Sequence, residues 1–212
     1  MMLCTLAMLK TYLGITGDTQ NDFLTLLIKQ ISSQIENYLG YQLARCENTE
    51  LHNVNNEQLL LLDLQPIQSV SSVKIGETVI DDYKVLPKYA KVGMLYRGKG
   101  WCGDYYTRGN MTYDVMSGVY EIEVEYVSGY YLPSEEGYVE GEAESLPFDI
   151  ISACLVACSE LYNLKANKGE GLKSYSEGGI SMSFGDTTTM ADCGLSAKVC
   201  SMLTDYKRQA VA

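Results

Sequence analysis

The sequence predicts an α+β protein in which a core of four helices and one β-hairpin is interrupted by a large β insertion. Apolar residues recur at helical spacing near the start of the chain and again after residue 146. Between these regions they alternate with polar residues at the two-residue period of β-strands. We therefore divide the 212 residues into segments 1–41, 42–140 and 141–212, of which the middle one is the insertion.

The first segment is predicted to hold two helices. Residues 5–13 form a short helix that Thr5 can cap. A longer helix follows, which Asp18 or Thr19 caps, with Asp22 in position to complete a capping box. Its apolar side chains form one wide stripe at helical spacing, typical of a helix that packs on a core: Phe23, Leu24, Leu27, Ile28, Ile31, Ile35, Tyr38 and Leu39.

The middle segment is predicted to be built from short strands. Apolar runs at 70–75, 79–80 and 83–86 are separated by turn residues. The clearest strand is 119–126, which alternates apolar residues with glutamates and so has one wet, acidic face. The Gly-rich, aromatic stretch 97–110 between these strands is predicted to be an exposed loop.

The third segment is predicted to hold two helices and a hairpin. Pro147 begins a helix that runs to residue 164 and is apolar nearly all round, so it should be buried nearly all round. In a chain of this length we expect a neighbouring subunit to cover it. Two alternating runs within 172–184 flank Gly178-Gly179 and predict a hairpin that is marginal by itself. A last helix follows from Leu195.

Composition excludes several classes of function. The net charge is −11, and residues 51–145 carry 7 Lys+Arg against 15 Asp+Glu, so binding to nucleic acid through phosphate neutralisation is not expected. The apolar run 148–164 contains polar residues and is too short to cross a bilayer. Seven cysteines without a CxxC pair indicate free thiols in a reducing cytoplasm, and neither a metal site nor a cofactor site is predicted.

Catalytic residues are not predicted either. His52 is the only histidine and sits in a polar stretch without an assignable partner. The pair Asp81-Asp82 and the row Glu121, Glu123, Glu125 are typical of solvated surfaces. A small hydrolase that uses such carboxylates remains a minor alternative, and it requires two of them in one cleft with opposed pKa values.

The insertion is rich in aromatic residues, which leaves a second alternative open. Eleven of the seventeen tyrosines lie between residues 83 and 138, and Trp101 is the only tryptophan. Such residues are enriched in protein interfaces and mixed β cores, which we favour. They can also stack on sugars, and a glycan- or host-surface-binding module would place Trp101 and exposed tyrosines along one groove.

The order of these elements resembles the head–tail connector proteins (adaptor or head-completion proteins) of tailed phages. The resemblance rests on LAMLKTYLGITGDTQNDFLTLLIKQISSQIENYLGYQL (6–43) and LPFDIISACLVACSELYNLKANKGEG (146–171). The hairpin SYSEGGISMSF and the final DYKR add to it, so that about half of the chain is covered. Compact members of the family run almost directly from the second helix to the third, so the insertion departs from their pattern.

The resemblance implies a structural protein of the virion neck, assembled in the host cytoplasm. Members form a ring, usually of twelve copies, between the portal protein and a stopper or tail-completion protein, and genomic DNA passes through without specific binding. In this connector core the implied portal contacts are Ser174, Tyr175, Ile180, Met182, Phe184, Leu195, Val199, Leu203 and Tyr206. The implied contacts between copies are Phe23, Leu27, Ile31, Ile35, Ile151, Leu155 and Cys158.

Overall fold

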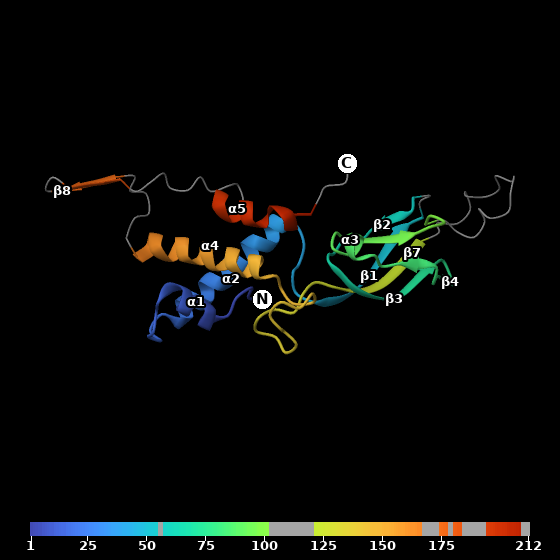
Figure 1. The fold of residues 1–212 in the computed structure, drawn as a ribbon, viewed down its shortest axis with the longest axis horizontal. Helices are drawn as coiled ribbons and strands as arrows, with labels where there is room; N and C mark the ends of the chain where they lie inside the picture. Colours follow the sequence, from blue (N-terminus) through green and yellow to red (C-terminus); the bar gives the residue numbers. More distant parts are fainter. Residues whose placement is uncertain (55–56, 102–120, 167–173, 178–179, 184–193, 209–212) are drawn as a thin grey trace. The chain divides into compact units, whose positions relative to one another are not determined.

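The computed structural model describes residues 1–54, 57–101, 121–166, 174–177, 180–183 and 194–208 (Figure 1). It contains helices and antiparallel sheets, which confirms the α+β class. The chain forms two compact units. The helical unit comprises Met1–Gly40 and Tyr131–Ala212, and the β unit comprises Tyr41–Tyr130, so the β unit ends ten residues before the predicted end of the insertion.

The helical unit is built from helices whose ends follow local sequence signals, with one exception. Its described helices are α1 (Leu6–Leu13), α2 (Asn21–Leu39), α4 (Phe148–Ala166) and α5 (Ala197–Leu203), the last continued by a 3-10 turn, Thr204–Tyr206. The Thr5 side chain accepts a hydrogen bond from the Met8 N–H and caps α1, as predicted. Gly14 and Gly40 end α1 and α2 with φ of 69° and 85°, in the left-handed region that favours glycine.

The predicted cap of α2 is wrong. The N-cap residue is Gln20, and its side chain makes no capping hydrogen bond. Asp18 instead accepts hydrogen bonds from Lys10 Nζ at 2.8 Å and Asn21 Nδ2 at 3.1 Å. The carboxylate is therefore engaged with the end of α1 and the first residue of α2, and the free N–H groups of the first turn lack a side-chain acceptor.

The core of the helical unit lies around α4, which packs against α1, α2 and α5. In α4, Ile150, Ile151, Cys154 and Cys158 are fully buried, as are Leu24 and most of the predicted stripe of α2. The expectation that a neighbouring subunit is needed to cover α4 is therefore wrong. Three helices of the same chain surround it, and the sequence pattern alone does not show how many neighbours a helix has.

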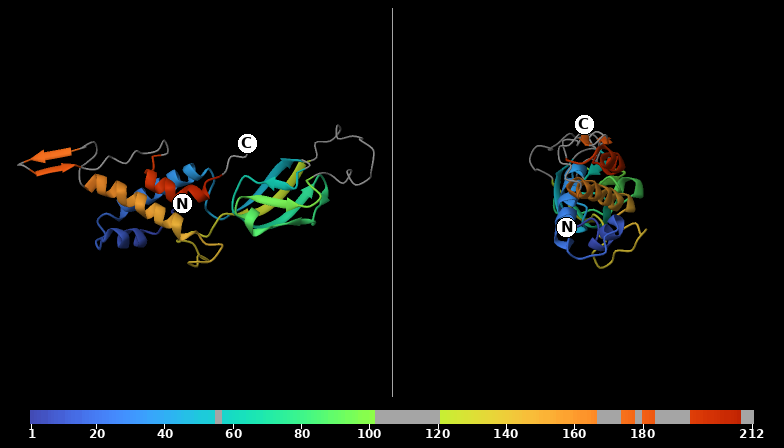
Figure 2. Two further views of the ribbon diagram at one scale, coloured as in Figure 1. Left: turned by 45° about the horizontal axis from the view of Figure 1, so that its top comes forward. Right: turned by 90° about the vertical axis from the view of Figure 1, so that its left-hand side faces the viewer.

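The β unit contains two antiparallel sheets and a short helix, α3 (Pro87–Ala90) (Figure 2). The four-stranded sheet has the order β1 (Cys46–Asn53), β7 (Glu121–Ser128), β3 (Ile67–Ile75) and β4 (Thr78–Val79). The three-stranded sheet has the order β2 (Leu59–Leu61), β6 (Met94–Arg97) and β5 (Tyr83–Lys84). The central strand β7 pairs with β1 on one side and with β3 on the other, and β3 is irregular at two points.

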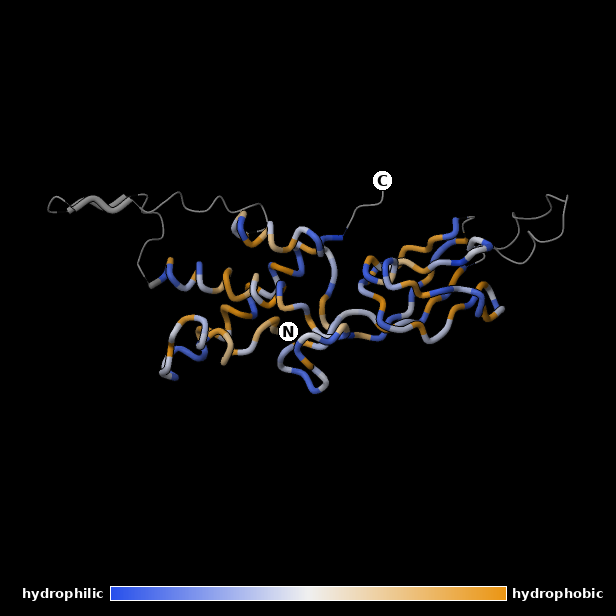
Figure 3. The backbone as a smooth tube through the Cα atoms, in the orientation of Figure 1, coloured by the Kyte–Doolittle hydropathy of each residue, from blue (hydrophilic) through white to orange (hydrophobic). Residues whose placement is uncertain are grey.

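Strand β7 confirms the predicted alternation. Ile122, Val124 and Tyr126 are buried, while the intervening glutamates are exposed or half-buried. Figure 3 shows the same alternation of hydrophobic and hydrophilic residues along the strands of the β unit. The buried face of β7 thus forms the middle of a core to which both sheets contribute.

The prediction of an exposed loop at 97–110 is wrong for Arg97 and Trp101. Arg97 is the last residue of β6 and is only 4% exposed, and Trp101 is fully buried in the core of the β unit. The backbone N–H of Trp101 donates to the backbone carbonyl of Glu57 at 3.0 Å, which fixes the chain next to the start of β2. The glycines around Trp101 led to the prediction of a loop, but burial of the large apolar indole draws this residue into the core. The rest of the stretch, 102–110, lies outside the described residues.

The β unit is entered and left at one place. Arg45 N–H donates to the Tyr130 carbonyl at 2.9 Å, and Tyr130 N–H donates to the Leu43 carbonyl at 2.8 Å. At Gly129, which has φ of 84°, a Cβ atom would lie 2.4 Å from the Ala44 carbonyl oxygen, so the two backbone segments touch.

The predicted hairpin is confirmed. Strands β8 (Ser174–Glu177) and β9 (Ile180–Ser183) pair antiparallel, with Glu177 opposite Ile180 and Ser174 opposite Ser183. None of the described helices is long and apolar enough to span a membrane.

Candidate functional site

The residues predicted to join copies of the chain lie in the core of the helical unit. Six of them are at most 8% exposed and come together from α2 and α4: Leu27, Ile31, Ile35, Ile151, Leu155 and Cys158. They hold α2 against α4 within one chain. Of the seven, Phe23 alone is partly accessible. Contact between copies at these positions stays a prediction.

Phe23 belongs to a small surface cluster where α2 begins and α4 ends. Its ring lies 6.5 Å from the ring of Tyr162, and Lys165 Nζ lies 3.6 Å from the centre of the Phe23 ring. The ammonium group is attracted to the negative face of the aromatic ring, so the three side chains are held together. The cluster presents apolar surface and a positive charge side by side, a combination suited to a protein interface.

The residues predicted to bind the portal are divided between two elements. Val199 and Leu203 in α5 and Leu195, two residues before α5, are buried, so they attach the helix to its own unit. Tyr206 is half-buried, and its hydroxyl donates to Asp149 Oδ2 at 3.2 Å.

The other predicted portal contacts lie in or beside the hairpin. Tyr175 and Met182 are opposite each other in the β8–β9 pair, Ser174 begins β8 and Ile180 begins β9. Phe184 lies outside the described residues. Contact between this hairpin and a portal stays a prediction.

Exposed apolar residues of the helical unit were not anticipated from the sequence. Leu26 on α2 is 65% exposed, Tyr12 on α1 is 51% exposed and Phe148 at the start of α4 is 59% exposed. Leu26 lies off the apolar stripe of α2, at a position where the helical period places polar residues. That mismatch was the signal that could have identified it as a surface available to a partner.

The acidic row on β7 faces outward and is partly neutralised. Lys74 on β3 donates to Glu123 Oε1 at 2.6 Å, and Ser72 donates to Glu125 Oε2 at 2.9 Å. The hydrogen bond and the charge of Glu123 raise the pKa of Lys74. Glu121 is exposed, and the face as a whole remains acidic.

A polar network inside the β unit was also missed. Glu50 on β1 accepts a hydrogen bond from the Tyr126 hydroxyl, lies 2.8 Å from His52 Nε2, and accepts from the Asp63 N–H at 2.9 Å. The Tyr126 hydroxyl in turn accepts from the Leu64 N–H at 3.2 Å. Because Asp63 and Leu64 follow β2, this carboxylate ties the edge strand of one sheet to the end of a strand in the other.

The pKa values in this network follow from its hydrogen bonds. Burial pushes the pKa of Glu50 upward, but the hydrogen bonds from His52, Tyr126 and the Asp63 N–H outweigh burial, and the net shift is downward. Burial and the neighbouring Glu50 carboxylate raise the pKa of Tyr126. Glu50 is thus charged and Tyr126 neutral over a wide pH range, as a structural bond between them requires.

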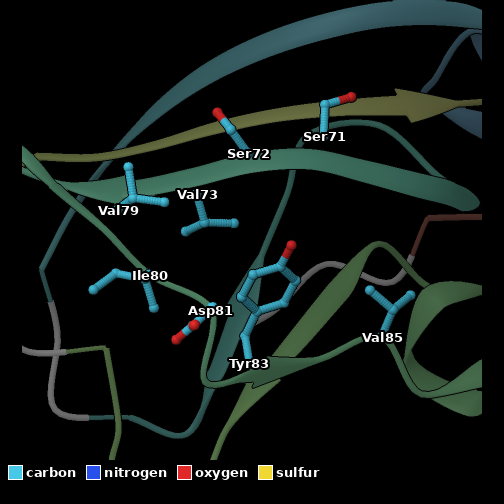
Figure 4. A pocket seen from close by; sticks show the side chains of 8 residues that line it. All are labelled: Ser71, Ser72, Val73, Val79, Ile80, Asp81, Tyr83 and Val85. Atoms are coloured by element: carbon cyan, nitrogen blue, oxygen red, sulfur yellow. The ribbon is translucent and has the colours of Figure 1, made fainter.

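A cleft of about 410 Å³ lies where β3 and β4 face β5, and it does not have the features of an active site (Figure 4). It is lined by valine, isoleucine and serine side chains, by Tyr83 and by a single carboxylate, Asp81. The adjacent Asp82 is paired with Arg97 at 2.6 Å and with Lys99 at 3.3 Å, and these cations lower its pKa. The pair of carboxylates that the hydrolase alternative requires is not found in this cleft.

Trp101, the residue on which the glycan-binding alternative mainly depends, is not available to a ligand. Trp101 is fully buried and cannot stack on a sugar in an open groove. In the part of the chain that the structure describes, no three His, Cys, Asp or Glu side chains are arranged to hold a metal ion.

Comparisons with known proteins identify the family. The family model described as "head completion protein" matches residues 2–209. The fold is similar to a chain in the neck of an empty gene transfer agent (GTA) particle, with a TM-score of 0.53, 11% identity, and coverage of 99% of this chain and 92% of that one. It is also similar to a chain in the virion of a native GTA particle, with a TM-score of 0.51, 14% identity and coverage of 99% and 92%.

No curated protein sequence matches the chain. The structural alignments include nearly all of this chain, and so the β unit has a counterpart in both structures. The family match extends over almost the whole sequence, from the first helix through the β unit to the residues after α5. This chain therefore belongs to the head completion protein family.

Proposed function

We propose that the chain is a structural subunit of the virion neck. Copies of it form a ring, usually of twelve, beneath the portal, and the ring joins the DNA-filled head to a stopper or tail-completion protein. The observation that carries the proposal is the head completion family match over residues 2–209. The similarity of the fold to a chain from the neck of a GTA particle supports it.

The proposed role requires no turnover. The subunit acts by presenting surfaces to its partners, and the cleft beside β3 holds a single carboxylate rather than a catalytic pair. The net charge of −11 favours passage of DNA, because a surface that does not neutralise phosphates does not retain it.

Contact between neighbouring copies is proposed to use the surface of α2. Leu26 is 65% exposed, and the partly exposed Phe23 lies one turn earlier beside Tyr162 and Lys165. The buried residues Leu27, Ile31 and Ile35 act indirectly, because they hold the helix that presents these side chains. Contact with the portal is proposed to use the β8–β9 hairpin and the adjoining C-terminal residues up to Tyr206.

Native mass spectrometry of the full chain, alone and mixed with its cognate portal, tests the proposal. The expected result is a portal complex that carries one ring of this subunit. A stable monomer that leaves the portal unchanged would refute the proposed role.

A matched pair of variants then tests the proposed contact between copies. Leu26→Glu should abolish the ring and leave the monomer folded, because the side chain is solvated before assembly. Gln30→Glu, which adds the same charge one turn later on the exposed side of α2, is the control and should leave the ring intact.

A further inference from the structure

Three thiols gather in the core of the helical unit, although the sequence separates them widely. Cys4 precedes α1, and Cys154 and Cys158 lie on consecutive turns of α4. The Sγ atoms of Cys4 and Cys154 are 3.7 Å apart and belong to residues 150 positions apart in the chain. All three cysteines are fully buried and free.

We propose that Cys4 and Cys154 form an intrachain disulfide when the subunit meets a small-molecule disulfide such as oxidised glutathione, and that this bond fastens the segment before α1 to α4. The two sulfurs are already in van der Waals contact inside one core. Forming the bond therefore requires a short approach of two side chains and no rearrangement of the helices. The inference does not depend on the ring.

Cys4 is the thiol that reacts first. It lies in the stretch before α1, which belongs to no helix or strand and is held at Leu3 by one hydrogen bond from its N–H to Ser32 Oγ at 3.0 Å. Release of this stretch would expose the buried side chains of Leu3 and Cys4 without unfolding a helix. Cys154, in the middle of α4, can be uncovered only by dismantling the core.

The thiol cluster also favours this order. Hydrogen bonds from Cys154 and Cys158 lower the pKa of Cys4 and outweigh its burial. Hydrogen bonds with Cys158 and Cys4, together with burial, raise the pKa of Cys154. The thiolate is the nucleophile in disulfide exchange, so Cys4 is the better attacking group.

The exchange is balanced in two steps. The Cys4 thiolate attacks one sulfur of oxidised glutathione, and the first glutathione thiolate leaves. Once Cys4 returns to its place, the Cys154 thiolate attacks the Cys4 sulfur, and the second glutathione thiolate leaves. Two protein thiols are oxidised, one glutathione disulfide is reduced to two thiols, and the two protein protons pass to these products.

The bond would act on the chain segments that flank the β unit. Cys4 comes before that unit and Cys154 after it, and so a covalent link would join the two halves of the helical unit directly. A disulfide that closes such a long loop restricts the unfolded chain strongly. A subunit made in a reducing cytoplasm would then gain this restriction only after release into oxidising surroundings.

Intact-mass measurement and peptide mapping of the full-length protein test the proposal. The reduced, folded protein is incubated with oxidised glutathione, and free thiols are then blocked before digestion. The expected product has lost two hydrogen atoms and yields one linked peptide pair that joins Cys4 to Cys154. Its thermal midpoint should exceed that of the reduced protein, and a reductant should reverse the difference.

Two variants separate the roles of the α4 thiols. Cys158→Ala should form the same bridge as the unmodified chain. The double variant Cys154→Ala/Cys158→Ala should accumulate glutathione on Cys4, because no thiol remains beside it to complete the exchange. If the folded protein keeps both thiols, or if its bridge joins Cys4 to Cys158 or involves Cys46, Cys102, Cys193 or Cys200, the proposal is overturned. The map of the unmodified chain decides the question even if a variant does not fold.

Discussion

The two units of this protein are stabilised in different ways. In the helical unit the buried polar side chains of the described residues are the hydroxyls of Ser32, Ser145 and Ser196. In the β unit a guanidinium is buried at Arg97, and the half-buried carboxylate of Glu50 holds two sheets together. Apolar packing is non-directional and independent of pH, whereas charged hydrogen bonds require fixed geometry and fixed protonation.

The difference teaches which changes each unit tolerates. The aliphatic residues that make up most of the helical core should accept substitutions that conserve volume. A β core with a buried guanidinium and a carboxylate network should respond sharply when one partner is removed, since the remaining polar group is left without a hydrogen bond.

The largest expected effect is that of Trp101→Ala. Removal of a fully buried indole should cost about 3–5 kcal/mol of the free energy of unfolding of the β unit. Hydrogen exchange, read by mass spectrometry, should show lost protection in β1, β3 and β7 and unchanged protection in α2 and α4. Trp101→Phe is the control and should cost much less, because Trp101 Nε1 has no hydrogen-bond partner in the described structure and no bond is lost. Equal loss in both units would contradict the division.

The next effect is that of Glu50→Ala. This change leaves the Tyr126 hydroxyl and the Asp63 N–H without their shared acceptor and should cost about 1–3 kcal/mol. Glu47→Ala on the exposed face of the same strand is the matched control and should stay within about 0.5 kcal/mol of the unmodified chain. Chemical denaturation monitored by circular dichroism measures both. A similar cost for the two variants would show that the network contributes nothing.

A smaller effect is expected from pH. The pKa of Glu50 is lowered in the folded state, so the network stabilises the β unit above the ordinary glutamate pKa of 4.5 and loses this contribution as pH falls through the lower, folded value. The denaturation midpoint of the β unit should therefore decrease as the pH is lowered below 4.5, and Glu50→Gln should make this decrease shallower. An unchanged pH profile in Glu50→Gln would assign the dependence to other groups.

The smallest effect is that of Thr5→Ala in the helical unit. Loss of the cap hydrogen bond to the Met8 N–H should cost about 1 kcal/mol, and it should do so equally at pH 4 and pH 7 because no charge is involved. Thr5→Ser, which keeps the acceptor, is the control. The midpoint of thermal unfolding, monitored by circular dichroism, provides the comparison. A clear dependence of the Thr5→Ala effect on pH would weaken the contrast between the two units.

Local signals were sufficient for much of the fold. Thr5 caps α1 and Gly40 ends α2 because both act through neighbours in the sequence. The β8–β9 hairpin and the alternation on β7 follow from periods of two residues. Ile31 was predicted to lie on a core-packing face of α2, and it is buried there. Leu203 was recognised as an apolar position of the last helix, and it is buried as well.

The remaining features depend on contacts between distant residues. Strand β1 has polar side chains on its inner face, so it lacks the apolar alternation by which strands are recognised. Glu50 finds Tyr126 only because β1 pairs with β7, 76 residues away in the sequence. Asp18 forms a hydrogen bond with Lys10 and does not cap α2. Each of these features depends on which distant elements lie side by side, and the sequence pattern alone does not show that.

The close approach of Ala44 and Gly129 has a consequence for how proteins of this kind can vary. A module whose two ends touch can change in length at little cost to its host, because each doubling of a flexible loop adds only about 0.6 kcal/mol of closure entropy. In the chain of the helical unit, the β unit takes the place of a single connection between Gly40 and Tyr131. Related chains can accordingly exchange, shrink or lose this module while the helical framework stays the same, which makes the junction a natural point for grafting.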